Sequence, residues 1–181
     1  MVVMADKSVP TSDHIRDIIS FVEASPTSYH AVAELTRRLE QAGFQRLEET
    51  ESWPSVEGRR YVVRDGAVIA WITPEKVTPQ LGARIVGSHT DSPSFKLKPN
   101  ATVTNQGWQQ VGMEVYGGGL LNSWLDRDLG LSGRLVTCDG QAHLVRTGPI
   151  LRISQLAPHL DRTVNDDLKL DRQRHLMPIL S

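Results

Sequence analysis

The hydrophobic period of the chain changes near residue 60, and this change limits the folds open to it. Before that point, one run of apolar residues follows helical spacing, at positions i, i+3, i+4 and i+7, and consists of Ile15, Ile18, Ile19 and Val22. It predicts an amphipathic helix over residues 13–24. Beyond residue 60, short β-branched runs alternate with Gly-containing turns. Helices followed by a hairpin and a strand favour an α/β layer over a helical bundle.

A second helix is predicted over residues 29–42. Ser28 offers an N-cap hydroxyl, and Gly43 stands where helices often end in the left-handed conformation. The stripe expected to be buried consists of Val32, Leu35 and Leu39. His14 and His30 lie near the helix starts, where a surface or capping role suits them better than metal binding.

Two strands are predicted next, over residues 61–64 and 67–72. Asp65-Gly66 joins them, and Asp-Gly is typical of a type I′ hairpin turn because both turn residues need positive φ. A further β-branched strand is predicted over residues 83–88. This strand runs directly into His89-Thr90-Asp91.

Beyond Pro99 the chain is predicted to be mostly β. Strand-like runs cover residues 111–116, 129–137, 142–145 and 150–153. Cys138-Asp139-Gly140-Gln141 indicates a hairpin turn between two of them. We therefore expect two domains, over residues 1–98 and 99–181.

Charge and composition exclude several functional classes. Lys and Arg total 20 against 21 Asp and Glu, a balance that argues against nucleic-acid binding. No apolar run approaches the roughly 18 residues of a membrane span, and residues 1–13 lack the apolar stretch of a signal peptide. The single cysteine, Cys138, excludes an internal disulfide and a multi-cysteine zinc site. We therefore expect a cytoplasmic protein that binds neither nucleic acid nor membranes.

His89 and Asp91 are the sharpest candidates for chemistry. They follow a predicted strand, at the edge where open α/β sheets bind ligands, and side chains two residues apart on a strand share a face. Imidazole is a good zinc ligand, and a nearby carboxylate commonly orients it. The spacing alone favours an ordinary hydrogen-bonded pair over a metal site.

Other polar runs carry structural interpretations. Gly117-Gly118-Gly119 lacks the pattern of a phosphate loop and favours a turn or a close backbone approach. Asp126 and Asp128 flank Arg127, which favours a local ion-pair group that fixes a turn over an acid–base pair.

The histidines outside these runs also carry structural interpretations. His159 stands beside apolar residues, which by itself favours a packed imidazole over a metal ligand. His143 and His175 receive the same interpretation. Cys138 has no evident base beside it, so no nucleophile arrangement stands out.

Several motifs together resemble the M18 aspartyl aminopeptidases, in unbroken order over residues 15–181. They are Ser25-Pro26-Thr27-Ser28-Tyr29-His30, Gly87-Ser88-His89-Thr90-Asp91-Ser92-Pro93, Tyr116-Gly117-Gly118-Gly119, Trp124-Leu125-Asp126-Arg127-Asp128, Pro149-Ile150-Leu151-Arg152-Ile153, His159-Leu160-Asp161-Arg162 and His175-Leu176-Met177-Pro178-Ile179-Leu180. The resemblance implies a di-zinc exopeptidase that removes N-terminal Asp or Glu from peptides. It also implies a catalytic α/β domain interrupted by a β-rich dimerisation domain, with assembly from dimers to dodecamers. Residues 1–98 would begin the catalytic domain, and residues 99–181 would form part of the inserted domain.

The resemblance also assigns roles. His89 resembles the first zinc ligand, and Asp91 the carboxylate that holds this histidine in the correct tautomer. His159 matches a histidine associated with the zinc site, either in its own subunit or donated to a neighbour, which replaces its packed interpretation. Family members run to more than twice this length, and the remaining ligands and the general-base glutamate lie in their C-terminal part. We therefore expect this chain alone to be inactive; the alternative is a non-catalytic interaction or oligomerisation module derived from the family.

Overall fold

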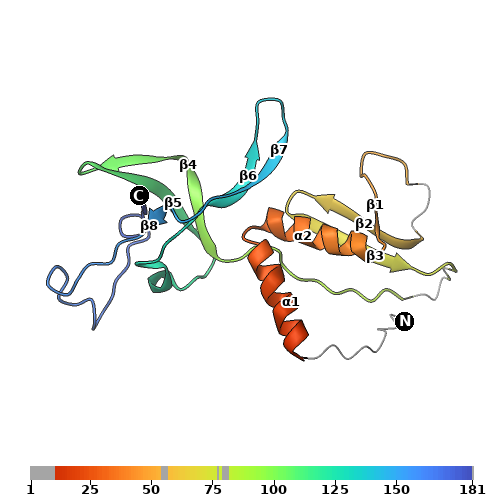
Figure 1. Ribbon diagram of the computed structural model, residues 1–181, viewed down its shortest axis with the longest axis horizontal. Helices are drawn as coiled ribbons and strands as arrows, with labels where there is room; N and C mark the ends of the chain where they lie inside the picture. The colour runs from red at the N-terminus through yellow and green to blue at the C-terminus, as the bar shows by residue number, and fades with distance from the viewer. Residues whose placement is uncertain (1–10, 54–56, 77, 79–81, 181) are drawn as a thin grey trace. The chain divides into compact units, whose positions relative to one another are not determined.

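The chain divides into two compact units, one ending at Asp91 and one beginning at Ser92 (Figure 1). The computed structural model describes residues 11–53, 57–76, 78 and 82–180. Most of the segment weighed above as a signal peptide therefore lies outside the described residues. The boundary expected between residues 98 and 99 falls inside strand β4 (Ser94–Asn105), all of which belongs to the second unit.

Both predicted helices form in the first unit, as α1 (Thr11–Ala24) and α2 (Ser28–Gln41). The N-cap of α2 is Thr27, one residue before the expected Ser28. The Thr27 hydroxyl oxygen accepts a hydrogen bond from the backbone N–H of His30 at 3.3 Å.

The end of α2 matches the prediction at Gly43, whose φ is +79°. The Gly43 N–H donates to the carbonyl of Glu40, and the Phe44 N–H donates to that of Leu39, both at 2.9 Å. These two bonds form a Schellman motif, in which a left-handed residue satisfies the last carbonyls of the helix.

The apolar stripes of the two helices are less buried than their spacing suggests. On α1, the stripe from Ile15 to Val22 is at least half exposed. On α2, Val32 is buried, whereas Leu35 and Leu39 are only half-buried. The spacing therefore predicted both helices correctly. It did not predict how far the other described residues bury the apolar side chains of these helices.

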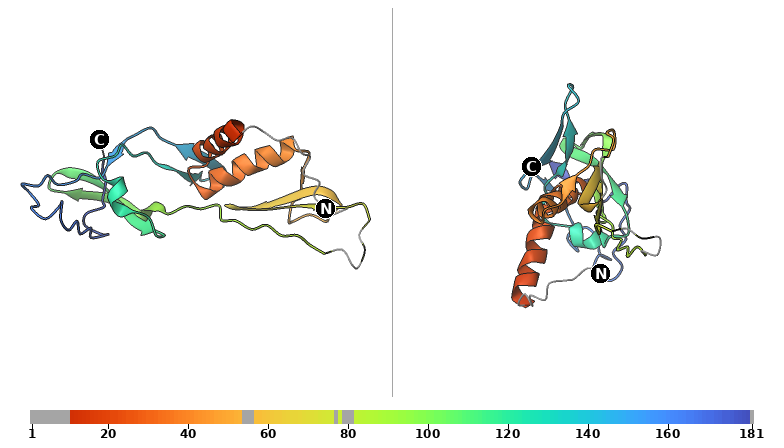
Figure 2. Two further views of the ribbon diagram at one scale, coloured as in Figure 1. Left: turned by 90° about the horizontal axis from the view of Figure 1, so that it is seen from below. Right: turned by 90° about the vertical axis from the view of Figure 1, so that its right-hand side faces the viewer.

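The sheet of the first unit contains β1 (Gln45–Arg46), β2 (Gly58–Arg64) and β3 (Ala67–Thr73). β1 is parallel to β2, and β2 and β3 form the predicted antiparallel hairpin. Helix α2 lies along one face of this sheet (Figures 1 and 2). In the turn, Asp65 has a φ of 51°, but Gly66 lacks the positive φ of a type I′ turn, so that part of the prediction is wrong.

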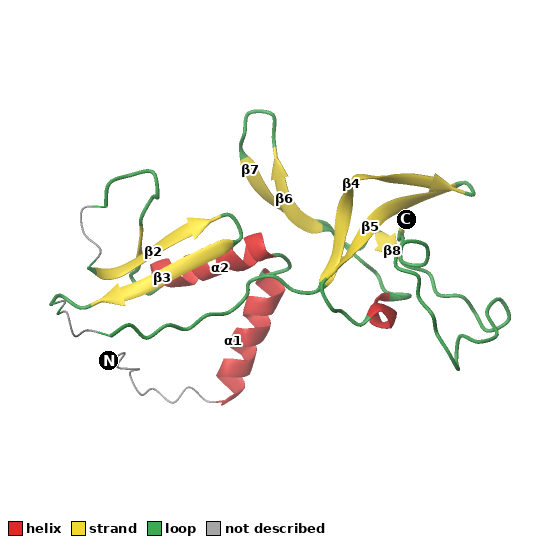
Figure 3. Cartoon of the chain, turned by 180° about the vertical axis from the view of Figure 1, so that it is seen from behind, coloured by secondary structure: helices red, strands yellow, loops and turns green. Residues whose placement is uncertain are grey.

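The strand predicted over residues 83–88 does not form. Figure 3 shows this segment as a loop, in which Ile85 is 89% and Val86 is 97% exposed. A strand is defined by backbone hydrogen bonds to a neighbour. None of the strands within the described ranges pairs with these residues.

The second unit is built almost entirely of strands. A four-stranded sheet has the order β4-β5-β9-β8, with β5 at Trp108–Tyr116, β8 at Leu151–Arg152 and β9 at Ile179–Leu180. A separate hairpin joins β6 (Ser132–Val136) to β7 (Ala142–Arg146), which confirms the turn predicted at Cys138–Gln141. The one short helix described in this unit is the 3₁₀ helix η1, over Leu121–Trp124.

Strand β4 was not predicted, because it passes through Pro99. Its pairing with β5 shifts register between Leu97 and Thr102, so an irregularity accommodates the proline, which has no N–H to donate. The core of this unit consists of Leu125, Ile153 and Leu176, each at most 8% exposed. Phe95 of β4 and Val115 of β5 pack against it.

Candidate functional site

His89 and Asp91 do come together, but not through a strand. The His89 Nδ1 atom lies 2.6 Å from the backbone carbonyl oxygen of Asp91. A carbonyl oxygen only accepts hydrogen bonds, so Nδ1 carries the proton and donates it. The lone pair of the neutral ring is therefore on Nε2. Because the side chain is 78% exposed, Nε2 is available to a ligand.

The Asp91 carboxylate lies farther from the His89 ring than the backbone carbonyl of Asp91 does. Its Oδ1 atom lies 3.5 Å from His89 Nδ1. In this structure the carbonyl of Asp91, rather than its carboxylate, selects the tautomer. The expectation that both side chains extend from one strand face is wrong, because residues 89–91 are not in a strand.

Thr90 connects this segment to the rest of the first unit. Its hydroxyl donates a hydrogen bond to the carbonyl oxygen of Gly66 at 2.7 Å. Thr90 is half-buried, whereas residues 82–89 are exposed.

His159 lies in the second unit, in a turn, and is exposed. The packed interpretation of its imidazole is therefore wrong. The turn is closed by the N–H groups of Leu160 and Asp161, which donate to the carbonyl of Ala157 at 2.9 and 3.1 Å. Asp161 Oδ1 in turn accepts from both the backbone N–H and the hydroxyl of Thr163.

The packed interpretations of His143 and His175 are also wrong, since both are exposed. His143 lies on β7. The His175 Nδ1 atom accepts a hydrogen bond from the backbone N–H of Asp171 at 3.0 Å. His175 therefore stabilises a local turn.

The expected ion-pair group around Asp126 exists with a different cation. Arg152, not Arg127, lies 3.7 Å from Asp126 Oδ1 and 3.5 Å from Asp128 Oδ1. Arg152 also donates to the Asp126 carbonyl at 3.0 Å, and Asp126 has a φ of 54°. The group fixes a turn, as predicted, but a residue 26 positions away supplies the charge.

The glycine run also has a structural role. Gly117 has a φ of +74°, and a Cβ placed there would lie 3.2 Å from the Cβ of Pro93. This close approach confirms the interpretation of Gly117 as a position that needs glycine.

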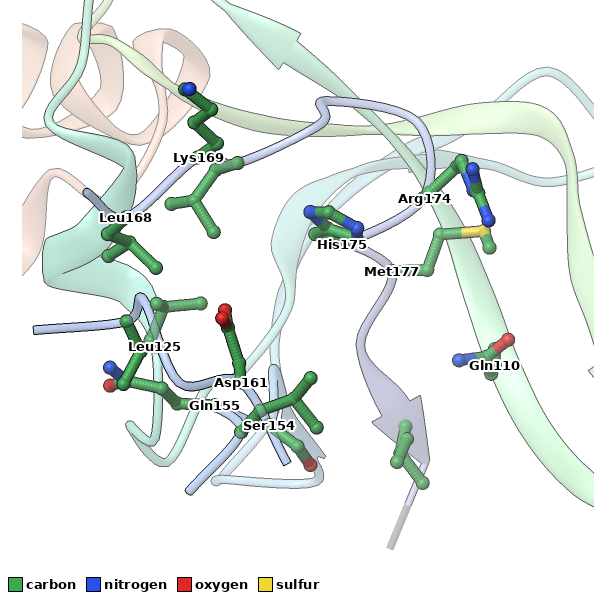
Figure 4. A pocket seen from close by; sticks show the side chains of 14 residues that line it. Gln110, Leu125, Ser154, Gln155, Asp161, Leu168, Lys169, Arg174, His175 and Met177 are labelled. Carbon is green, nitrogen blue, oxygen red and sulfur yellow. The ribbon is translucent and has the colours of Figure 1, made fainter. Parts of the chain in front are cut away.

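The second unit contains a pocket of about 250 Å³ (Figure 4). Asp161, His175 and Gln110 come from different segments and line it, and the Gln110 Oε1 atom is buried without a hydrogen-bond partner. Lys169 and Arg174 also line the pocket, so its polar groups carry both signs of charge.

The described residues fit one ligand position of a zinc site rather than a complete site. A catalytic zinc ion takes three protein ligands. His89 has the required free nitrogen, but nowhere among the described residues do three or more His, Cys, Asp or Glu side chains form a group able to hold a metal ion.

Residues 21–181 match the family model described as aminopeptidase I zinc metalloprotease (M18). This match, over a chain whose first unit is α/β, identifies a metallopeptidase sequence. The chain belongs to the M18 family of metallo-aminopeptidases.

Individual relatives agree with this assignment. The chain is 55% identical over 168 residues to a probable M18 family aminopeptidase 2 of Streptomyces avermitilis, which covers 92% of this chain and 39% of the relative. It is 40% identical over 176 residues to a probable aspartyl aminopeptidase of Ricinus communis, and the match covers 91% of this chain and 36% of that relative. The solved mApe1 dodecamer of S. cerevisiae matches with a TM-score of 0.76 at 29% identity, and the match covers 93% of this chain and 38% of the mApe1 chain. The chain thus spans about two fifths of the length of the curated relatives it matches.

Neither α1 nor α2, nor any other helix in the described part of the chain, has the length and apolar character needed to cross a bilayer.

Proposed function

We propose that this chain is the N-terminal part of a cytoplasmic zinc aminopeptidase that removes Asp or Glu from the N-terminus of peptides. The observation that carries the proposal is the exposed His89 ring, whose Nδ1 is bound and whose Nε2 is available. The M18 family match supports zinc, and the aspartyl aminopeptidase among the relatives supports an acidic substrate.

In this proposal, His89 binds zinc through Nε2, and Asp91 orients the ring. His159 contributes to the zinc site of its own subunit or of a neighbouring one. A complete active site holds two zinc ions, and bound zinc lowers the pKa of a water molecule and polarises a carbonyl. Residues 1–98 begin the catalytic α/β domain, and residues 99–181 form part of an inserted dimerisation domain.

The 181-residue chain alone is inactive in this proposal, because the described residues supply too few grouped ligands. The purified chain with added zinc should therefore not hydrolyse Asp-, Glu- or Leu-anilides above the level of its His89→Ala variant. Turnover selective for the acidic anilides and lost in that variant would refute the proposed inactivity.

A chimera tests the activity itself. This chain would replace the matching N-terminal part of the Streptomyces relative, to which it is 55% identical. We expect hydrolysis of Asp- and Glu-anilides, and loss of that activity in His89→Gln. The matched control is His143→Gln, an exposed histidine on β7 that should leave activity unchanged. A fully active His89→Gln chimera would refute the zinc role of His89.

The alternative function, an oligomerisation module, is supported by the β6–β7 hairpin. Its apolar side chains are 41–57% exposed and are Leu135, Val136, Leu144 and Val145. An isolated two-stranded hairpin is marginally stable in water, so a covering surface would stabilise it. The S. cerevisiae dodecamer supports a second copy of the chain as the partner. Sedimentation should show an oligomer that dissociates in Leu135→Ser/Val145→Ser; a monomeric wild-type chain would refute the module.

A further inference from the structure

We propose that Thr90 is a positioning residue that holds the His89 imidazole in place by tethering its segment to the β2–β3 turn. The inference rests on the proposed role of His89 and extends it to a residue that binds no metal.

The segment before His89 has little that could fix it. Residues 82–89 are exposed and belong to no strand, and the side chains of Ile85 and Val86 are almost fully exposed. The Ser88 hydroxyl donates a hydrogen bond to the carbonyl of the adjacent His89, and this bond does not anchor the segment elsewhere. Thr90 is the next residue, and its bond to Gly66 crosses 24 positions of sequence.

The acceptor of this bond is itself held firmly. Gly66 lies in the two-residue turn between β2 and β3. A Cβ at Gly66 would lie 2.6 Å from the Ser28 hydroxyl oxygen and 3.0 Å from its Cβ, so the turn packs directly against the first residue of α2. The Gly66 carbonyl is therefore fixed from two sides, by the hairpin and by the helix.

The tether also controls the imidazole ring. His89 Nδ1–H donates to the carbonyl of Asp91 at 2.6 Å, and this bond spans Thr90. Three consecutive residues thus share two hydrogen bonds, one inside the segment and one to the hairpin. Loss of the outer bond removes the link between the inner bond and the hairpin, so the direction of Nε2 becomes less sharply defined.

Two substitutions separate the hydrogen bond from the shape of the side chain. Thr90→Val keeps the branched side chain and removes the donor, whereas Thr90→Ser keeps the donor. A single hydrogen bond of this kind changes a local equilibrium by about 5-fold. We therefore expect the released state of the segment to become about 5-fold more populated in Thr90→Val and to stay close to wild type in Thr90→Ser.

The test measures the 181-residue chain by NMR without metal. In wild type, backbone order parameters at residues 89–91 should approach the value of about 0.85 typical of rigid backbone, and those at residues 84–87 should be lower. In Thr90→Val the values at 89–91 should fall, and the ¹⁵N shifts of the His89 ring should indicate a mixture of tautomers. Thr90→Ser should restore both readouts. The control Thr104→Val, on an exposed position of β4, should change neither.

Order parameters at 89–91 that are unchanged in Thr90→Val would overturn the proposal, as would an equal fall in Thr90→Ser. Unchanged signals from helix α2 and strand β2 in both variants will show that the first unit, which contains Thr90 and Gly66, remains folded. In the active chimera, Thr90→Val should weaken zinc binding by about 10-fold, and Thr90→Ser should restore it. A tether present in the NMR data together with a fully active His89→Gln chimera would refute the proposed function and not the tether.

Discussion

The phenol of Tyr61 is predicted to ionise far above its ordinary range. Tyr61 is fully buried in the sheet of the first unit, and its hydroxyl donates a hydrogen bond to Glu40 Oε1 at 2.6 Å. Burial is the main cause and the Glu40 carboxylate the second; together they raise the pKa of Tyr61 to about 12.

The sign of the effect on stability follows from the protonation states. The folded chain keeps the neutral phenol, whereas an unfolded tyrosine loses its proton near pH 10. This stabilisation is therefore complete below about pH 10 and is lost as the pH rises towards 12. A rise of the Tyr61 pKa from 10 to about 12 corresponds, at about 1.4 kcal/mol per tenfold change in the ionisation constant, to roughly 3 kcal/mol of unfolding free energy.

The assay is a spectrophotometric titration of tyrosinate absorbance, compared between wild type and Tyr61→Phe. The chain has three tyrosines, so the difference curve isolates the single residue removed. Its midpoint should lie near pH 12. A difference curve centred near pH 10 would refute the reasoning, because it would mean that the hydroxyl is neither buried nor paired with Glu40.

Three further predictions concern stability, measured by urea denaturation of the 181-residue chain. Ile153→Ala should destabilise the second unit by about 2–5 kcal/mol, since the side chain is 1% exposed; a loss below about 1 kcal/mol would mean that the site is not a packed core. Gly43→Ala should cost about 1 kcal/mol because of the φ of +79°, and no loss would argue against the Schellman motif. Hydrogen bonds from Arg37 and Arg38 lower the pKa of Glu34 to about 2. The stability it contributes is present above its ordinary pKa of 4.5 and is lost as the pH falls towards 2. In Glu34→Gln, the free energy of unfolding should fall less between pH 4.5 and pH 2 than in wild type. The same pH dependence in both proteins would contradict the ion pairs of Glu34 with Arg37 and Arg38.

The sequence by itself determined the features that depend on neighbours within a few residues. The end of α2 at Gly43 and the β6–β7 turn at Cys138–Gln141 follow from the local backbone preferences of the residues in those segments. The M18 assignment likewise follows from short motifs in a fixed order, and residues 21–181 match that family.

Candidate residues could be identified from the sequence, but their environments could not. Spacing identified His89 and Asp91, and the family resemblance assigned the tautomer of His89 to the Asp91 carboxylate. In the structure the Asp91 main-chain carbonyl holds it. The tether from Thr90 to Gly66 carried no sequence signal, because its partners are 24 residues apart.

Tertiary structure decided everything that needs a distant partner. Residues 83–88 have the composition of a strand, but no described strand pairs with them, and composition cannot supply a backbone partner. Arg152 rather than Arg127 neutralises Asp126 because the chain returns there after 26 residues. His159 is exposed although apolar residues adjoin it in sequence, since burial depends on what packs over a side chain in space.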